Sequence, residues 1–386
     1  MLLSNLISIP TGQGVDILIK GETIQSVSES IKDSVETKIE FKGALVFPGL
    51  INSHEHLDFN LFPKLGNRIY NNYVEWGDDI HEQNKEVIDK VLKVPLKLRI
   101  TWGMYKNLLN GVTTVVNHGP QLPIGEGFIT VLQEKFPYAL HSIQLDKKWR
   151  YKLNFPFLAK HPFVIHIGEG ADDMAKKEID TLLKWNLLKR ELIGIHAIAL
   201  NEKQAAKFKA IIWCPDSNYF LVGQTAPINK LKKSTQILFG TDSNVSSSWN
   251  LWEHLRLARE QKMVTDEELF NMLTVAAAKV WQLPHAGIIE KGYNADIIVG
   301  RHKAGLQGMN AWYNLNPEDI LLVMHKGGIC LFDEELHTQL SKQIELKNFC
   351  KVFISGNCKY VLGDIPRLMA QIREYYPEAS FPITDN

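Results

Sequence analysis

Between residues 48 and 283, short apolar runs alternate with amphipathic segments, and this alternation constrains the fold more than any other feature. The runs at 50–54, 112–118, 138–145, 163–167, 192–198, 210–215 and 236–242 have the character of buried strands. We expect helices near 81–110, 125–135, 171–190, 201–209, 250–261 and 265–281, the last with Thr265 as N-cap and Glu268 three residues on. Strands alternating with helices pair in parallel, and so long a series favours a closed barrel.

One passage of this series is too short for a regular unit. Only seventeen residues, 146–162, separate two of the expected strands, and two of them are prolines. A strand–helix–strand unit needs about 30 residues. We therefore expect seven clear strands and one irregular passage, or a barrel that is not fully closed there.

The sequence pattern at both ends of the chain differs from that of the central part and predicts short strands and turns. Two alternating runs flank Gly21-Glu22 and predict a hairpin, and short strands return from about residue 284, followed by a helix near 365–376. The apolar start lacks a basic region and a cleavage-like site, so we interpret it as a strand and not as a signal peptide. The simplest expectation is one β-rich domain built from residues 1–47 and 284–386, beside a central domain of residues 48–283.

Composition excludes several classes of partner. Lysine plus arginine and aspartate plus glutamate balance at 43 each, which gives no electrostatic reason to bind nucleic acid or an anionic membrane. No apolar run approaches the roughly 20 residues that span a bilayer. The four cysteines form no C-x-x-C pair, and we expect a reduced, cytoplasmic protein.

Polar side chains gather where the expected strands end. In chain order they are His54 and His56, His118, His141, His166 with Glu169, His196, and Asp242. The carboxyl ends of parallel barrel strands converge on one face, and residues i and i+2 of a strand point to the same side. His54 and His56 could therefore hold one cation together. Imidazole suits Zn²⁺ and Fe²⁺, and three histidines with one carboxylate leave room for a bound water.

Taken singly, each of these residues has a simpler explanation. A lone H-x-H pair occurs by chance, His166 could be a core histidine, and Asp242 could belong to a turn or an N-cap. Their common position at strand ends favours a metal site. We expect His118 and His141 to line a pocket rather than to bind the metal. Glu55, which alternates away from its two neighbours, is not expected to be a ligand.

Several motifs in order resemble one family. They are "FPGLINSHEHLD", "NGVTTVVNHG", "HIGEG", "GIHAIAL", "CPDSNYFL", "FGTDSNVSSS" and "GIIEKGYNADIIVG". The chain resembles the amidohydrolase superfamily over roughly residues 15 to 330, in the deaminase and chlorohydrolase branch that includes guanine, cytosine and S-adenosylhomocysteine deaminases. The resemblance implies an α/β fold, a distorted (β/α)8 TIM-like barrel with a small β-sandwich built from both termini.

The same resemblance implies a site for a single divalent metal. It assigns His54, His56, His166 and Asp242 as ligands, Glu169 as the acid of the H-x-x-E motif, and His196 as the histidine beside the metal-activated water. Zn²⁺ is the first expectation, with Fe²⁺ as the alternative. Asp242 would accept a proton from the water, His196 would stabilise the tetrahedral adduct, and Glu169 would protonate the substrate ring. No lysine is found where it could be carboxylated to bridge two metals.

The expected function is hydrolysis of a non-peptide C–N bond, most simply deamination of a small nitrogen-containing ring. The alternatives are hydrolysis of a cyclic amide or a C–halide bond, or a barrel that has lost catalysis and only binds. The expected partner is a small-molecule substrate, and a homodimer is left open.

Relatives tend to have a basic residue at the position of Asp216. Because this chain differs there, the substrate of any one relative is not assigned to it. Trp76, Trp249 and Trp252 could stack on a planar ring or simply pack.

Overall fold

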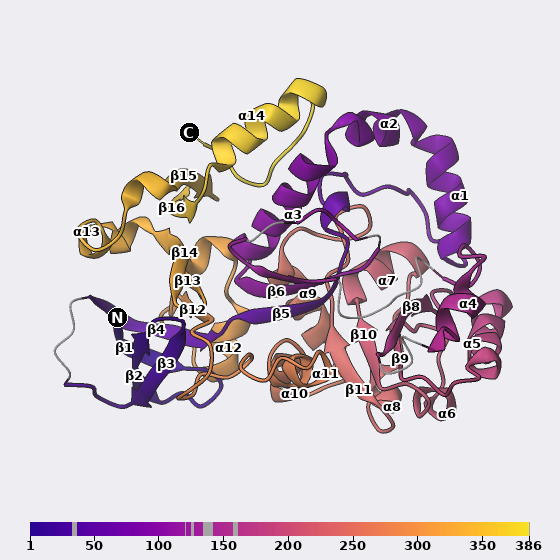
Figure 1. Cartoon of the computed structure of the whole chain (residues 1–386), viewed down its shortest axis with the longest axis horizontal. Helices are drawn as coiled ribbons and strands as arrows, with labels where there is room; N and C mark the ends of the chain where they lie inside the picture. Colours follow the sequence, from indigo (N-terminus) through magenta and orange to yellow (C-terminus); the bar gives the residue numbers. More distant parts are fainter. Residues whose placement is uncertain (33–36, 120, 125–126, 134–141, 157–160, 386) are drawn as a thin grey trace.

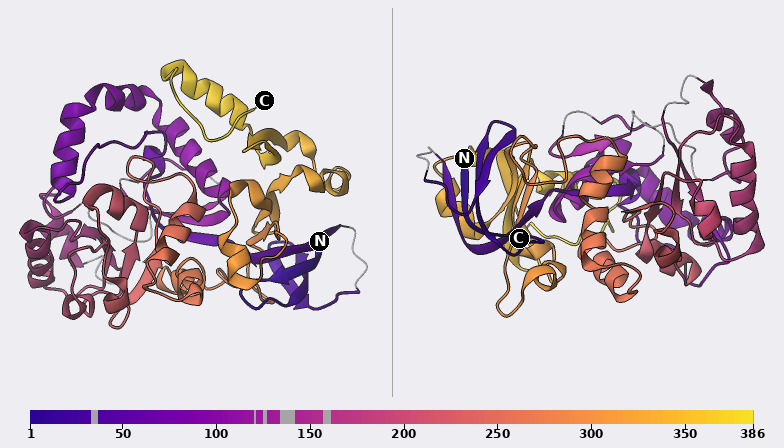
Figure 2. Two further views of the ribbon diagram at one scale, coloured as in Figure 1. Left: turned by 180° about the vertical axis from the view of Figure 1, so that it is seen from behind. Right: turned by 90° about the horizontal axis from the view of Figure 1, so that it is seen from below.

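A computed structural model of the chain describes residues 1–32, 37–119, 121–124, 127–133, 142–156 and 161–385 (Figure 1). The strands in these residues form sheets of nine, four and three strands. The nine-stranded sheet lies at one end of the molecule, the same end as both termini, and the two smaller sheets lie beyond it (Figure 2). This arrangement separates the strands of the chain ends from those that carry the histidines.

The nine-stranded sheet combines strands from both ends of the chain. Its order is β15-β16-β14-β13-β12-β4-β1-β2-β3. The hairpin expected around Gly21 is the antiparallel pair β2–β3. The bounds are β1 Leu2–Ser8, β2 Gly14–Lys20, β3 Thr23–Ser28, β4 Lys38–Pro48, β12 Ile297–Gly300, β13 Ile320–His325, β14 Gly328–Asp333, β15 Phe349–Ile354 and β16 Asn357–Leu362. Because the described strands hydrogen-bond into one sheet, the predicted β-sandwich is not confirmed.

The central strands pair in parallel, but in two separate ladders. The three-stranded sheet has the order β5-β6-β7 and the four-stranded sheet the order β11-β10-β9-β8. Within the described residues no ladder joins the two sheets, so the closed barrel is not observed. The bounds are β5 Leu50–Glu55, β6 Val112–Asn117, β7 Thr130–Leu132, β8 Phe163–Ile167, β9 Leu192–His196, β10 Ala210–Trp213 and β11 Gln236–Phe239.

Two predictions around the irregular passage are wrong. In the expected strand 138–145, residues 143–145 form a turn, Ser142 belongs to no helix or strand, and the remaining residues, including His141, lie outside the described residues. Within the expected helix 125–135, Thr130–Leu132 form strand β7, which pairs in parallel with β6. Threonine, valine and leucine here fit a pleated surface beside β6 better than a helix. The passage 146–162 itself contains a short helix, α4 (Trp149–Leu153).

Most expected helices form, with shorter bounds. The single helix expected near 81–110 is three helices, because Asn84 ends the first and Pro95, which cannot donate a backbone hydrogen bond, precedes the third. Thr265 and Glu268 form the predicted capping box. The bounds are α1 Tyr73–Gln83, α2 Lys85–Lys93, α3 Leu96–Leu109, α5 Asp173–Trp185, α6 Glu202–Ala205, α7 Pro215–Val222, α8 Ile228–Leu231, α9 Leu251–Glu260, α10 Asp266–Met272, α11 Val275–Val280, α12 Gly308–Tyr313, α13 His337–Leu340 and α14 Ile365–Tyr375.

Burial of the central strands explains their apolar sequences. Every residue of β5, β6, β8, β9 and β10 is buried, which is expected of parallel strands covered on both faces. The four cysteines are free thiols. Within the described part of the chain, none of the helices combines the length and apolar character that crossing a bilayer requires.

Candidate metal centre and active site

The ends of four central strands bring the predicted site residues together. His54 lies in β5 and His56 directly follows it, His166 lies in β8, and His196 is the last residue of β9. Asp242 follows β11 by three residues. All five side chains are buried, with residue exposures of 1% to 8%. Five ionisable groups are therefore concentrated in one place away from solvent.

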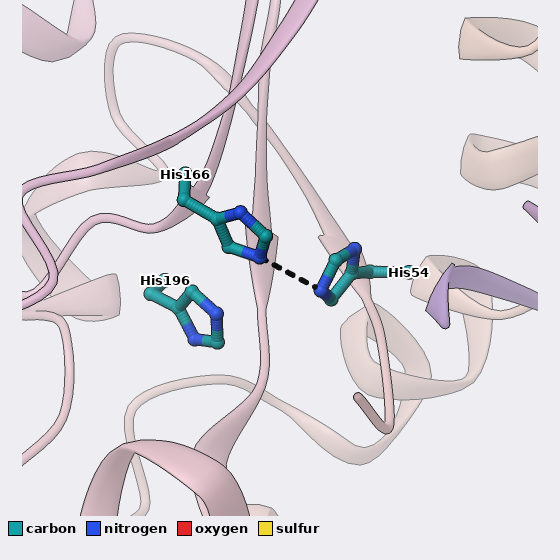
Figure 3. Close-up of side chains that lie close together, drawn as sticks. All are labelled: His54, His166 and His196. Atoms are coloured by element: carbon teal, nitrogen blue, oxygen red, sulfur yellow. Dashed lines mark hydrogen bonds between the residues drawn. The ribbon is translucent and has the colours of Figure 1, made fainter. Parts of the chain in front are cut away.

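His54 lies at the centre of this group. Its Nε2 atom is 3.2 Å from Nε2 of His166 (Figure 3), and 3.6 Å from Oδ1 of Asp242. His56 Nε2 is 3.8 Å from the same Oδ1 atom. Two sets of donor atoms lie within 4.8 Å of one another: His54, His166 and His196, and His54, His56 and Asp242.

These donors fit a divalent cation. Two nitrogens bound to tetrahedral zinc at 2.0–2.1 Å would lie about 3.3 Å apart, and the His54–His166 separation of 3.2 Å matches that spacing. Burial lowers the pKa of His54 to about 4, and burial with the neighbouring histidines lowers the pKa of His166. Both imidazoles are therefore neutral at pH 7, the form that binds metals.

Asp242 is held in a strained backbone conformation and in one orientation. Its φ of 56° lies in the left-handed region, which is uncommon for a residue with a side chain. The hydroxyl groups of Ser217 and Ser246 lie 2.8 and 3.1 Å from Oδ2, and the Ser243 amide donates to Oδ1. Burial disfavours its charge, but hydrogen bonding with His54 outweighs burial and holds the Asp242 pKa well below its usual value. Asp242 is thus an ionised carboxylate.

His196 faces the same site with a fixed ring. Its Nδ1 atom lies 2.8 Å from the Oδ1 atom of Asn218, so Nδ1 carries the proton and the Nε2 lone pair faces the site. The Nε2 atom is 3.5 Å from Oε1 of Glu169 and 3.9 Å from Oδ2 of Asp242. His196 therefore contacts both predicted acid–base groups and also joins one of the two donor sets.

Glu169 has the character of a proton donor. Burial, followed by the nearby charge of Asp242, raises the pKa of Glu169 well above its ordinary value. Behind it, the Glu178 side chain accepts a 2.6 Å hydrogen bond from the Gly168 amide and so anchors the turn between His166 and Glu169. A protonated carboxyl group that adjoins a cation site can donate to a bound ligand.

A pocket with apolar walls opens beside these groups. Its lining comprises His56, Phe59, Tyr73, Trp76, His166, Glu169, His196, Leu221, Asp242, Ser243, Val245 and Ser246. Trp76 lines the pocket, whereas Trp252 is fully buried and packs edge-to-face on Phe47 and Trp312. Trp249 packs against the main hydrophobic core. His118 is buried with its ring centre 5.4 Å from that of His54, and it is absent from both donor sets.

Sequence reasoning missed the residues that support the site. Ser217 and Asn218 follow β10 in "CPDSN", so their place after a strand end could have pointed to them. Lys106 gave no such signal, since it lies inside the expected helix and looks like a surface charge. Its side chain is buried beside Glu55.

Comparison with protein families gives one match. Residues 159–330, which include His166, Glu169, His196 and Asp242, match the model of the amidohydrolase family. Among curated proteins, the chain is 24% identical to the 5-methylthioadenosine/S-adenosylhomocysteine deaminase of Pyrococcus furiosus, over 87% of this chain and 95% of that one. It is also 24% identical to the 5'-deoxyadenosine deaminase of Methanocaldococcus jannaschii, over 75% and 83% of the two chains.

Solved structures share the fold at lower identity. The structure of an adenosine deaminase from Xanthomonas campestris with bound zinc superposes with a TM-score of 0.74 at 15% identity and covers 98% of both chains. The atrazine chlorohydrolase of Arthrobacter aurescens with zinc superposes with a TM-score of 0.69 at 18% identity, over 97% of this chain and 99% of that one. Both likenesses extend over nearly the whole chain.

Proposed function

We propose that this chain, a member of the amidohydrolase superfamily, is a metal-dependent hydrolase that removes an amino group from a small nitrogen-containing ring. One observation carries the proposal: the donor atoms of buried histidines and of Asp242 converge beside the buried Glu169 carboxyl group at the ends of parallel strands. The deaminases of Pyrococcus and Methanocaldococcus support the reaction type.

We propose His54, His56, His166 and Asp242 as the ligands of a single divalent ion, with zinc as the expected metal. The donor spacing and the lowered pKa values of His54 and His166 support this set, and zinc-containing neighbours support the choice of metal. His196 lies close enough to be a further donor. A cation held there would supply a nucleophile at neutral pH, because it lowers the pKa of water that it binds from 15.7 to about 7.

The surrounding side chains have the positions that hydrolysis needs. We assign proton acceptance to Asp242, whose carboxylate Ser217 and Ser246 keep oriented. Glu169, kept protonated by burial, would donate its proton to a ring nitrogen and later assist departure of ammonia. His196, with its ring fixed by Asn218, would orient the attacking oxygen by accepting a hydrogen bond from it at Nε2.

The pocket supports a small, planar and uncharged substrate. Phe59, Trp76, Leu221 and Val245 supply flat or apolar surface, and aromatic side chains favour contact with the face of a ring. Among the described residues that line the pocket there is no lysine or arginine to pair with an anionic group. We also propose that residues 48–283 form the catalytic domain and that residues 1–47 and 284–386 form a second domain.

Release of ammonia tests the proposed reaction. The zinc-loaded protein would be incubated with 5'-deoxyadenosine, 5-methylthioadenosine, S-adenosylhomocysteine, guanine, cytosine and atrazine, with ammonia and chloride measured in parallel. The proposal expects ammonia from at least one amino-substituted ring. Chloride without ammonia would favour the second candidate, a C–halide hydrolase, which the fold of the atrazine chlorohydrolase supports. Turnover of a cyclic amide without ammonia would also overturn deamination, and tight binding without any turnover would favour a lapsed enzyme.

A further inference from the structure

A buried ion pair lies directly behind the proposed metal ligands. The Nζ atom of Lys106 is 2.8 Å from Oε2 of Glu55, and the two side chains are 2% and 0% exposed. Glu55 stands between His54 and His56 in the sequence, and its side chain points to the other face of the strand, as predicted. Burying an ion pair costs desolvation free energy. The pair is unusual here because neither Glu55 nor Lys106 is a proposed metal ligand.

Glu55 fixes the end of β5. Its Oε1 atom accepts hydrogen bonds of 3.1 Å from the His56 amide and from the side chain of Asn60. The Asn60 side chain in turn donates to the carbonyl oxygens of His56 and Leu57. The Glu55 carboxylate therefore helps to fix the backbone that carries His54 and His56.

Lys106 reaches the other side of the site. Its ammonium group lies 3.3 Å from the carbonyl oxygen of Asp242 and 3.5 Å from the hydroxyl of Thr241. The Thr241 hydroxyl also lies 3.2 Å from Oε2 of Glu55. Because Asp242 has a left-handed backbone, external contacts are needed to keep its carbonyl in place. Lys106 supplies one of them.

The pair bridges the junction between the two central sheets. β5 belongs to one sheet and β11 to the other, and no strand ladder joins them in the described residues. Contacts outside a ladder join them instead, among them the Asp242 amide donating to the His54 carbonyl and the Asn52 side chain bonded to Thr241. His54 and His56 stand on one side of the junction and Asp242 on the other. The spacing of the ligands thus depends on what holds this junction.

We propose that the Glu55–Lys106 pair is a positioning device that sets the distance between the β5 histidines and Asp242, and so tunes metal affinity. This inference rests on the proposed metal centre. An apolar pair of similar volume would stabilise the fold as well or better. The ion pair adds hydrogen bonds of defined direction. They connect helix α3 to the backbone at the end of β5 and to the backbone of Asp242.

Zinc affinity of folded variants tests this role. Competition with a chromophoric chelator would give the zinc dissociation constant of the metal-free wild type, of Lys106→Met, and of Glu55→Gln/Lys106→Met, at a temperature where circular dichroism shows each to be folded. We expect Lys106→Met to weaken zinc binding by about 10–100-fold, the range for partners behind metal ligands. The double variant, which leaves no unpaired buried charge but still lacks the link to Asp242, should weaken it by about 10-fold.

A second buried ion pair in the chain provides the matched control. Lys359 and Asp333 are 2.5 Å apart in the nine-stranded sheet, with side chains 0% and 7% exposed. Lys359→Met should lower the melting temperature yet leave zinc affinity within twofold of wild type. The inference is overturned if the folded double variant also binds zinc within twofold of wild type, or if Lys359→Met weakens binding as much as Lys106→Met. A wild type that binds no zinc overturns the metal centre itself.

Discussion

The Oδ1 atom of Asn218 lies 2.8 Å from the Nδ1 atom of His196, and the Asn218 side-chain nitrogen donates to the hydroxyl of Thr225. In this orientation of the amide, Oδ1 accepts the hydrogen bond from the Nδ1–H group of the histidine ring. The ring of His196 therefore has one tautomer, with its unprotonated Nε2 toward Glu169 and Asp242. A residue outside the pocket lining thus controls a nitrogen at the centre of the site.

Asn218→Ala should lower kcat by about 10–100-fold, the usual cost of removing a partner behind a site histidine. Asn218→Asp keeps an oxygen that accepts from Nδ1 and should retain more activity than the alanine variant. Steady-state kinetics with a substrate found in the ammonia assay would check both. Equal losses in the two variants would show that tautomer control is not the role of Asn218.

Glu169→Gln should lower kcat by about 10²–10⁴-fold, because the amide cannot donate an acidic proton to the ring. The variant should still bind zinc with wild-type stoichiometry, since Glu169 belongs to neither donor set. Metal analysis and ammonia release would be measured on the same sample. Near-full turnover would remove Glu169 from the mechanism.

Glu178→Gln should make the protein more stable at neutral and alkaline pH. Burial raises the pKa of Glu178 to about 8 from an ordinary value of 4.5. Between those values the folded chain keeps a proton that the unfolded chain has lost, so stability falls as pH rises, by about 1.4 kcal/mol per pH unit. Glutamine can still accept from the Gly168 amide and does not ionise.

Thermal or urea unfolding from pH 5 to pH 8 would measure this difference. The difference between wild type and variant should be smallest near pH 5, and the variant should become increasingly more stable above it. A difference that stays constant over this range would mean that Glu178 does not hold its proton in the folded protein.

Local pattern predicted six of the central strands and the polar residues at their ends. The strand expected at 163–167 has those bounds, because a parallel strand buried on both faces has a nearly continuous apolar sequence, here interrupted by His166. The same reasoning placed His54, His56, His166, His196 and Asp242 at strand ends, where the fold brings them together. Resemblance to a family supplied the roles that periodicity alone left open.

Other features depend on contacts that no local pattern records. Lys106 looks like a surface residue of a helix, and charged residues are rarely buried unless paired. Its partner Glu55 lies 51 positions away, so the pairing depends on how α3 packs. The segment Thr130–Leu132 is likewise a strand because β6 offers it a partner. The predicted sandwich is not confirmed for a similar reason, since strand order is a property of the whole sheet.

The zinc content of the purified protein tests the central claim most directly. After zinc loading and removal of unbound metal, we expect one zinc ion per chain by inductively coupled plasma mass spectrometry. His166→Ala and Asp242→Ala, each folded by circular dichroism, should each retain less than about one tenth of that amount. A wild-type protein that retains no zinc or iron, or folded variants that retain as much as wild type, would contradict the proposed metal centre.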